Sequence, residues 1–335
     1  MKEMVGKRIL WLDALKGIGI ILVIISHSGL NVPYLNYLTA GYIQLFFVVA
    51  GFTYKPNLSI VTSLRKKASR LMIPYFFYGL CTLLLFCMIG GANLKNGLEG
   101  LLYGCHSLQA FPNNGDALLL PKGTSPLWFL PAMFTAYIVV CVVEKIEKNK
   151  VISIVIILSQ VGLALQPYLF PWSLDISVFF TLCILFGALC KNFFFTNKSL
   201  ALFMVALFGY VLLIKTNGNV NLSIREFGNF GCLSLLLCFL IGIVYTFLLS
   251  FICRAFEASV IVKYLGIIGK QSLRLMCIHY PIMIFVSDLL WHLHVKHIDG
   301  SVLFGIQIVT IAVCALLIQQ LVVKCSSRFS LLKYL

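Results

Sequence analysis

The chain has 335 residues, of which 60% are hydrophobic and only 11% are charged. Soluble domains carry about 25% charged residues, so this composition excludes a soluble protein and indicates that lipid is most of its solvent. The chain has 26 Lys and Arg against 11 Asp and Glu. Because the basic residues lie between apolar runs, this excess indicates membrane topology, and no nucleic-acid partner is expected.

Continuous apolar runs of helix length predict an all-α polytopic membrane protein, because barrel strands would alternate apolar and polar residues. No appended soluble domain is evident, so we expect residues 1–335 to form a single transmembrane domain. We predict about ten transmembrane helices, over residues 9–30, 37–54, 71–90, 125–143, 151–170, 174–194, 199–215, 231–252, 266–290 and 301–323.

The distribution of basic residues between these runs predicts the orientation. With ten helices both termini share one side, and 19 of the 26 basic residues fall on that side against 5 on the other. Since loops in the cytoplasm are enriched in Lys and Arg, both termini are predicted to be cytoplasmic. We expect a multi-pass protein of the cell membrane, the inner membrane in a bacterium.

Three ionisable residues, Asp13, Lys16 and His27, interrupt the first apolar run. Lys16 and His27 are eleven residues apart, which brings them within about 20° of one helix face and separates them by about 16 Å along the axis. Both side chains could simply reach toward the two headgroup layers. The alternative is a polar channel with a cation at its cytoplasmic mouth and a base near its outer end.

Two further polar features accompany later helices. The segment RKKASR, residues 65–70, precedes the third predicted span and indicates either topology and anionic lipid or a site for a phosphate-bearing ligand built on Lys67 and Arg70. His279 lies within the ninth span, two residues before Pro281. It is either a helix–helix hydrogen-bond partner or a site residue.

The loops predicted on the outer side are polar. Residues 91–124 and 216–230 are rich in Asn, which suits a carbohydrate ligand but is also what any outer loop requires. His292, His294 and His297 follow the ninth span, but no Cys joins them and on a helix the first two would diverge. We therefore predict no metal.

Six segments in this order resemble the acyltransferase-3 family of membrane acyltransferases, in particular its fucose 4-O-acetylase-like branch. The resemblance runs nearly end to end. The segments are WLDALKGIGIILVIISHS (11–28), FFVVAGF (46–52), Lys67-x-x-Arg70 followed by LMIPY (71–75), LWFLPA (127–132), PWSLD (171–175) and SLRLMCIHYP (272–281). Two departures stand out: Lys16 and Lys67 occupy places where many members have Arg, and the extra hydrolase-like domain of some members is missing.

The resemblance implies O-acyl transfer, most often of acetyl, from cytoplasmic acetyl-CoA to a hydroxyl of a cell-surface or exported carbohydrate or lipid-linked glycan. It implies that His27 and His279 are catalytic, with His27 as base or transient acyl carrier, and that the donor phosphates bind basic residues. The expected donor-binding residues are Lys16, Lys67 and Arg70, and the expected supporting residues are Asp13, Trp128, Asp175 and Arg274. Ionisable residues inside a span would also suit a secondary transporter or flippase for a polar solute, which is the alternative.

Overall fold

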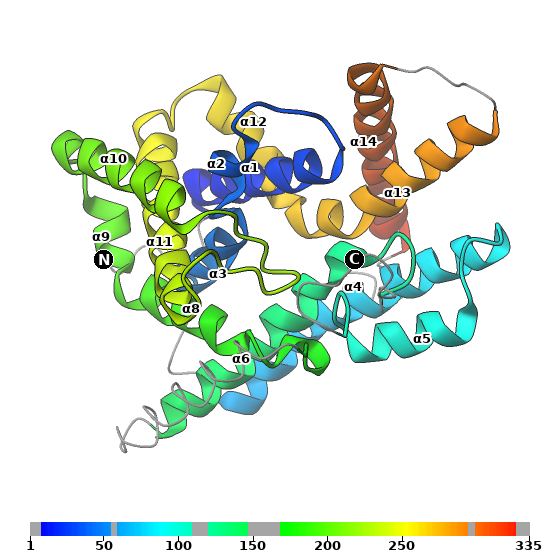
Figure 1. Ribbon diagram of the computed structural model, residues 1–335, viewed down its shortest axis with the longest axis horizontal. Coiled ribbons are helices and arrows are strands. Elements are labelled where there is room, and N and C mark those ends of the chain that lie inside the picture. The colour runs from blue at the N-terminus through cyan, green and yellow to red at the C-terminus, as the bar shows by residue number, and fades with distance from the viewer. Residues whose placement is uncertain (1–7, 55–58, 109–119, 147–167, 294–298, 326–335) are drawn as a thin grey trace.

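The computed structural model describes residues 8–54, 59–108, 120–146, 168–293 and 299–325 (Figure 1). Helices dominate this part of the chain, and an isolated β-bridge joins Asn221 and Glu226. The elements are, in chain order, α1 (Leu10–His27), α2 (Leu35–Thr39), α3 (Tyr42–Phe52), α4 (Ile60–Met88), α5 (Leu94–Tyr103), η2 (Ser125–Trp128), α6 (Phe129–Ile146), η3 (Pro171–Ser173), α8 (Ser177–Leu189), α9 (Lys191–Thr196), α10 (Leu200–Asn217), α11 (Cys232–Ala255), α12 (Val260–Lys270), α13 (Ser272–His292) and α14 (Gly300–Cys325).

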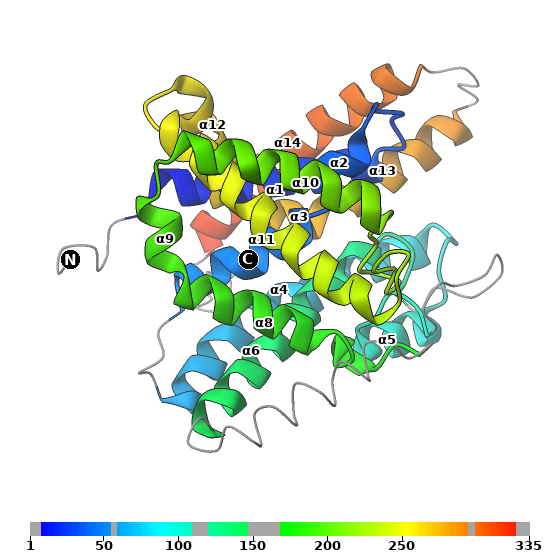
Figure 2. The same cartoon turned by 60° about the vertical axis from the view of Figure 1, so that its left-hand side comes forward.

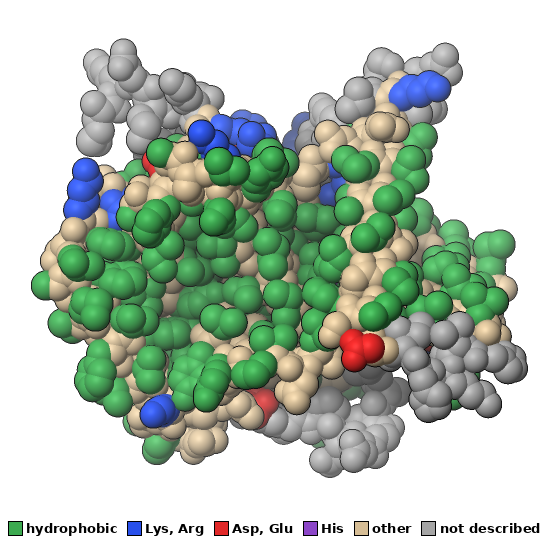
Figure 3. All heavy atoms as spheres, turned by 90° about the horizontal axis from the view of Figure 1, so that it is seen from above, with side chains coloured by type: hydrophobic (Ala, Val, Ile, Leu, Met, Phe, Trp, Pro, Cys, Tyr) green, Lys and Arg blue, Asp and Glu red, His purple; other side chains and the backbone are tan. Residues whose placement is uncertain are grey.

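Nine helical segments of the described residues are long and apolar enough to cross a membrane. They correspond in order to nine of the ten predicted spans, and the predicted span 151–170 lies mostly outside the described residues. The protein is therefore an all-α polytopic membrane protein, as the sequence predicts. The surface in Figure 3 agrees: hydrophobic side chains form a broad belt, with Lys and Arg gathered mainly along one edge. Which edge faces the cytoplasm stays a prediction.

Helix α1 lies between two groups of helices, α10 with α11 on one side and α13 with α14 on the other (Figures 1 and 2). It packs most closely against α12, where glycines let the two backbones touch. A Cβ atom at Gly17 would lie 2.1 Å from the Leu265 carbonyl oxygen, and one at Gly269 would lie 1.7 Å from the Asp13 carbonyl oxygen. Only glycine fits at either position, and small residues of this kind commonly join membrane helices. This contact fixes the helix that carries Lys16 and His27.

The helix boundaries correct the predictions in three places. Helix α4 begins at Ile60, so the basic segment 65–70 is part of the helix and does not precede it. Such an extension is favourable because Lys, Arg and Ala are good helix formers. The predicted spans 37–54 and 266–290 are each divided, at Ala40–Gly41 and at Gln271.

The long outer loop also contains a helix, α5, capped by the Asn93 side chain, which accepts a hydrogen bond from the Asn96 backbone. One face of it packs against α4, where Leu101 lies against Gly79 and Gly97 lies against Leu83, while Leu94, Leu98 and Leu102 stay exposed. This amphipathic helix has ten residues and is shorter than a membrane span. Because it lies within a segment of polar composition, hydropathy did not reveal it.

Candidate functional site

A cavity of 250 Å³, here called the basic cavity, brings together the three cations predicted to bind the donor. Lys16 reaches it from α1, and Lys67 and Arg70 reach it from α4. The Lys67 ammonium lies 3.7 Å from the centre of the Tyr137 ring on α6, a cation–π contact that holds it at the cavity wall. Arg65 and Lys66 are exposed and do not line the cavity, so α4 divides the basic segment between two faces.

Asp13 modifies the charge of this cavity. It is buried one turn before Lys16, and its Oδ1 accepts a hydrogen bond from the Lys16 ammonium at 2.7 Å. Its Oδ2 lies 3.7 Å from Arg8 Nε. The positive charge of Lys16 is thus largely balanced within α1, and Lys67 and Arg70 supply the charge that is left for an anionic ligand.

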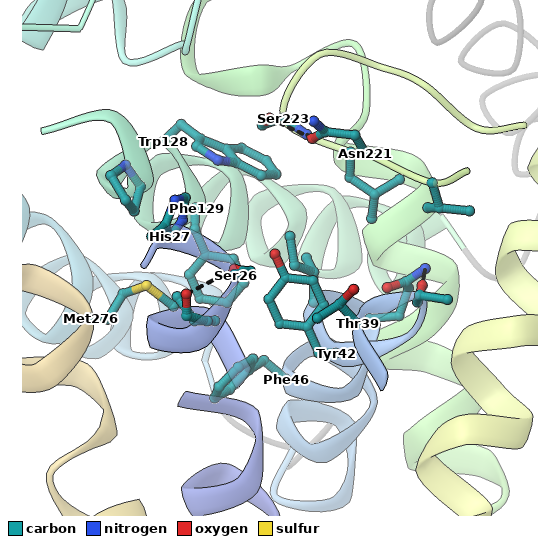
Figure 4. Close-up of a pocket in the computed structure, with 17 residues that line it drawn as sticks. Ser26, His27, Thr39, Tyr42, Phe46, Trp128, Phe129, Asn221, Ser223 and Met276 are labelled. Atoms are coloured by element: carbon teal, nitrogen blue, oxygen red, sulfur yellow. Dashed lines mark hydrogen bonds between the residues drawn. The ribbon is translucent and has the colours of Figure 1, made fainter. Parts of the chain in front are cut away.

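A second cavity of 320 Å³, the histidine cavity, contains His27 at the end of α1 (Figure 4). Thr39 and Tyr42 point their hydroxyl groups into it, and the Trp128 indole covers it. Its remaining polar wall is the loop 220–223, where Asn221 Oδ1 accepts a hydrogen bond from the Ser223 hydroxyl at 2.6 Å. Lys16 and His27 therefore lie along one helix but in different cavities, as their spacing predicts for a cation and a base at opposite ends of a path.

The two histidines predicted to be catalytic lie side by side. The rings of His27 and His279 have centroids 5.5 Å apart, and Tyr280 lies 5.0 Å from His27. His279 Nδ1 is 2.9 Å and 3.0 Å from the backbone carbonyl oxygens of Leu275 and Met276, so this nitrogen carries the proton. His279 Nε2 is then a buried acceptor, and it has no hydrogen-bond partner among the described residues.

A third histidine, His106, completes the cluster, and the sequence analysis missed it. It follows α5 and is close enough to His27 to interact electrostatically. Its Nδ1 lies 2.6 Å from the Ser125 hydroxyl. The preceding residue, Cys105, is buried and donates its thiol hydrogen to the Phe170 carbonyl at 2.7 Å. No sequence pattern marks His106, because it lies in a loop that tertiary contacts alone bring to α1.

The position of His106 predicts an acid-sensitive fold. Burial, aided by the positive charge of Arg225, lowers the pKa of His106 to about 4, whereas an unfolded histidine titrates near 6.5. Between these values the unfolded chain binds a proton that the folded chain does not, so stability falls as the pH falls through this window. Thermal unfolding in detergent at about pH 7 and about pH 5 should show a smaller loss of Tm for His106→Gln than for the wild type. Equal losses would contradict this assignment.

A buried ion pair holds the wall of the histidine cavity. Asp175 and Arg225 are 1% and 3% exposed, and the guanidinium donates to both carboxylate oxygens through Nε and Nη2. Arg225 Nη1 also donates to the carbonyl of Leu222 at 2.8 Å. Trp128 lies beneath this guanidinium, 5.7 Å from its carbon to the ring centre. Trp128 and Asp175, both predicted as supporting residues, thus both contact Arg225, which the sequence marks only as a loop charge.

A third cavity of 390 Å³, the asparagine cavity, adjoins the histidine cluster from the other side. Tyr280, the ring neighbour of His27, and Ser125, the partner of His106, both line it. Asn93 and Asn96 of the predicted outer loop supply further polar groups. Both loops expected to meet an acceptor, 91–124 and 216–230, therefore contribute residues to cavities that border His27 or its neighbours.

Two further predictions concern Arg274 and the three histidines within residues 292–297. Arg274 lines neither cavity; it donates to Gln271 at 2.7 Å and interacts with the Tyr78 hydroxyl, so it joins α13 to α4. Of the histidine trio at 292–297, only His292 is among the described residues, so that motif stays untested.

Comparison with known proteins gives one match. A family model described as an acyltransferase domain, Acyl_transf_3, matches residues 9–319. No curated protein and no solved structure matches the chain. The matched segment contains every residue that lines the basic and histidine cavities.

Proposed function

Since this chain belongs to the acyltransferase-3 family and is a membrane acyltransferase, we propose that it transfers acetyl from acetyl-CoA to a hydroxyl of a carbohydrate or lipid-linked glycan. The observation that carries the proposal is the pair of cavities along α1, one with unbalanced positive charge and one with His27. The family match favours this enzyme over the transporter that intramembrane charges also suit. The fucose 4-O-acetylase-like branch belongs to the same proposal.

The donor would enter at the basic cavity. Ligand pockets that enclose a whole cofactor measure about 300–1,000 Å³, so a cavity of 250 Å³ suits the pantetheine arm alone, with the nucleotide outside it. Lys67 and Arg70 would bind the phosphates at its mouth, and Lys16, positioned by Asp13, would add a third contact. By the positive-inside rule this mouth would face the cytoplasm, which is the compartment that supplies acetyl-CoA.

The reaction would take place beside His27. The acceptor hydroxyl attacks the thioester carbonyl, a C–O bond forms and the C–S bond breaks. The hydroxyl proton passes to His27 and from there to the departing thiolate, which leaves as free CoA. The His279 ring, whose centroid lies 5.5 Å from that of His27, would limit how far the His27 ring can turn. The second route has His27 itself attack the thioester, so that an acyl-imidazole then meets the hydroxyl.

The acceptor would occupy the histidine cavity, and a longer glycan would reach the asparagine cavity, which shares no lining residue with it among the described residues, past Tyr280, the ring neighbour of His27. Their walls present the hydroxyls of Thr39, Tyr42 and Ser223 and the amide of Asn221 on one side, and Asn93 and Asn96 on the other. Hydroxyl and amide groups can both donate and accept hydrogen bonds, which suits a polyhydroxylated ligand. Trp128 provides an aromatic face over the same cavity.

Removing the charges of the basic cavity should weaken donor binding. Each charge-assisted contact is worth about 1.5–3 kcal/mol, so Lys67→Ala/Arg70→Ala should raise the KM for acetyl-CoA by more than about tenfold. The matched control is Arg65→Ala/Lys66→Ala, which removes two charges of the same helix from outside the cavity. An equal rise in the KM for acetyl-CoA in both double variants would show that residues 65–70 serve membrane topology and do not form a specific donor site.

A direct test of the proposed function uses glycan from a strain in which the gene is deleted. Purified protein, labelled acetyl-CoA and this glycan should yield labelled glycan and free CoA. Mass spectrometry should show that the deleted strain's glycan lacks one acyl substituent, whose mass identifies the group. Uptake of a polar solute into vesicles without release of CoA would instead support the transporter.

A further inference from the structure

The basic and histidine cavities meet at three side chains from three different helices. Phe46 of α3, Phe129 of α6 and Met276 of α13 line both cavities, and among the described residues no other lining residue is shared. We call these three the shared ring. Since the cavities are otherwise separate, whatever passes from Lys67 and Arg70 to His27 passes these side chains.

The shared ring is held firmly by its neighbours. Phe129 and Met276 are each only 6% exposed, and the Phe46 and Phe129 rings meet edge to face with centroids 5.6 Å apart. Phe47 packs against the same Phe129 ring with centroids 5.2 Å apart. The Phe129 ring therefore has aromatic contacts with both Phe46 and Phe47, which limit how far it can turn.

Helix α1 sets the position of Phe46. A Cβ atom at Gly19 would lie 2.8 Å from Phe46 Cζ, so the tip of this ring rests on the glycine. Gly19 lies between Lys16 and His27 in α1, one turn beyond Lys16. The shared ring therefore lies between Lys16 and His27 along the axis of α1.

We propose, on the basis of the function proposed above, that the shared ring selects the acyl group by width and charge. The end of the pantetheine arm next to the thioester is an unbranched chain, and the acyl group precedes it through the ring. Acetyl adds only one methyl group to the carbonyl that every thioester carries. A group branched at its second carbon is wider, and a carboxylate such as that of succinyl would lose its hydration among two phenyl rings and a thioether. The substrates are therefore uncharged acyl groups without a branch at the second carbon.

The test compares kcat/KM for acetyl-CoA and isobutyryl-CoA, with glycan from the deleted strain as acceptor. Hydrophobic pockets discriminate single carbon groups by about 10- to 200-fold. Phe46→Ala and Met276→Ala should each lower the acetyl-to-isobutyryl ratio by at least about tenfold. Gly19→Ala, whose new methyl pushes the Phe46 ring into the path, should raise that ratio. Succinyl-CoA should stay a poor donor in Phe46→Ala, since this change adds width but no polar group.

Met133→Ala is the matched control, because Met133 lines the basic cavity but not the histidine cavity. Its ratio should equal that of the wild type. If Phe46→Ala fails to fold, Gly19→Ala and Met276→Ala carry the test. Two results would overturn selection by the shared ring while acetyl transfer persists. One is an unchanged acetyl-to-isobutyryl ratio in folded Met276→Ala and Gly19→Ala. The other is a change in Met133→Ala as large as in those variants. Wild-type protein that transfers no acetyl at all would overturn the proposed function and this inference together.

Discussion

His27→Ala is expected to lower the rate of acyl transfer by about 10²- to 10⁴-fold, the usual contribution of a general base. An imidazole nitrogen can accept a proton and release it again within one reaction, which suits a general base. The loss should be larger if His27 carries the acyl group, because the covalent route then has no nucleophile. The readout is CoA release with glycan acceptor, measured beside the Tm of the variant.

Donor binding separates a chemical defect from a folding defect. Lys67 and Arg70 lie in the other cavity, so acetyl-CoA should raise the Tm of His27→Ala as much as that of the wild type. A burst of CoA release without acceptor in the wild type, absent in His27→Ala, would identify the acyl-imidazole route. Turnover of His27→Ala near the wild-type rate would remove His27 from the mechanism and leave His279 as the next candidate.

Asp175→Ala is expected to have the largest effect on stability. It leaves the Arg225 guanidinium buried without its counter-charge, and breaking a buried pair in this way costs about 3–5 kcal/mol. The loop that Arg225 holds forms the polar wall of the histidine cavity, so activity should fall as well. The measurements are the Tm in detergent and the rate of acetyl transfer.

Two variants make this result specific. Asp175→Leu/Arg225→Met removes both charges and should recover much of the stability lost in the single variant. Asp288→Ala breaks the Lys122–Asp288 pair, which is 41% and 35% exposed, and such a pair is worth about 0–1 kcal/mol. A loss of Tm in Asp175→Ala no greater than in Asp288→Ala would show that the buried pair does not hold the site.

Nine of the ten predicted spans and their order followed from hydropathy, because lipid requires long apolar helices, and the tenth lies mostly outside the described residues. Helix ends were less predictable. The amphipathic face of α5 is too short to register in a polar segment, and α4 extends beyond the membrane for reasons of helix propensity. The break at Gln271 depends on how α12 packs against α1 through Gly269, which only the folded chain reveals.

The candidate site was predictable where its residues share one helix. The spacing of Lys16 and His27 along α1, and of Lys67 and Arg70 along α4, placed each pair on the cavity side. His106 and Arg225 were not predictable as site residues, since both lie in loops and reach the cluster through contacts distant in sequence. The shared ring could not be predicted either. In a membrane helix, the sequence does not distinguish an apolar side chain that lines a substrate path from one that packs in the core.

The central claim is that acyl groups pass from the basic cavity, through the shared ring, to an acceptor at His27 on the other side. The direct measurement places labelled acetyl-CoA only at the membrane face that carries Lys67 and Arg70, and glycan from the deleted strain only at the opposite face of sealed vesicles. Labelled glycan is expected at that opposite face with the wild type, and none with His27→Ala. Label that appears only when donor and acceptor share one face would contradict the central claim.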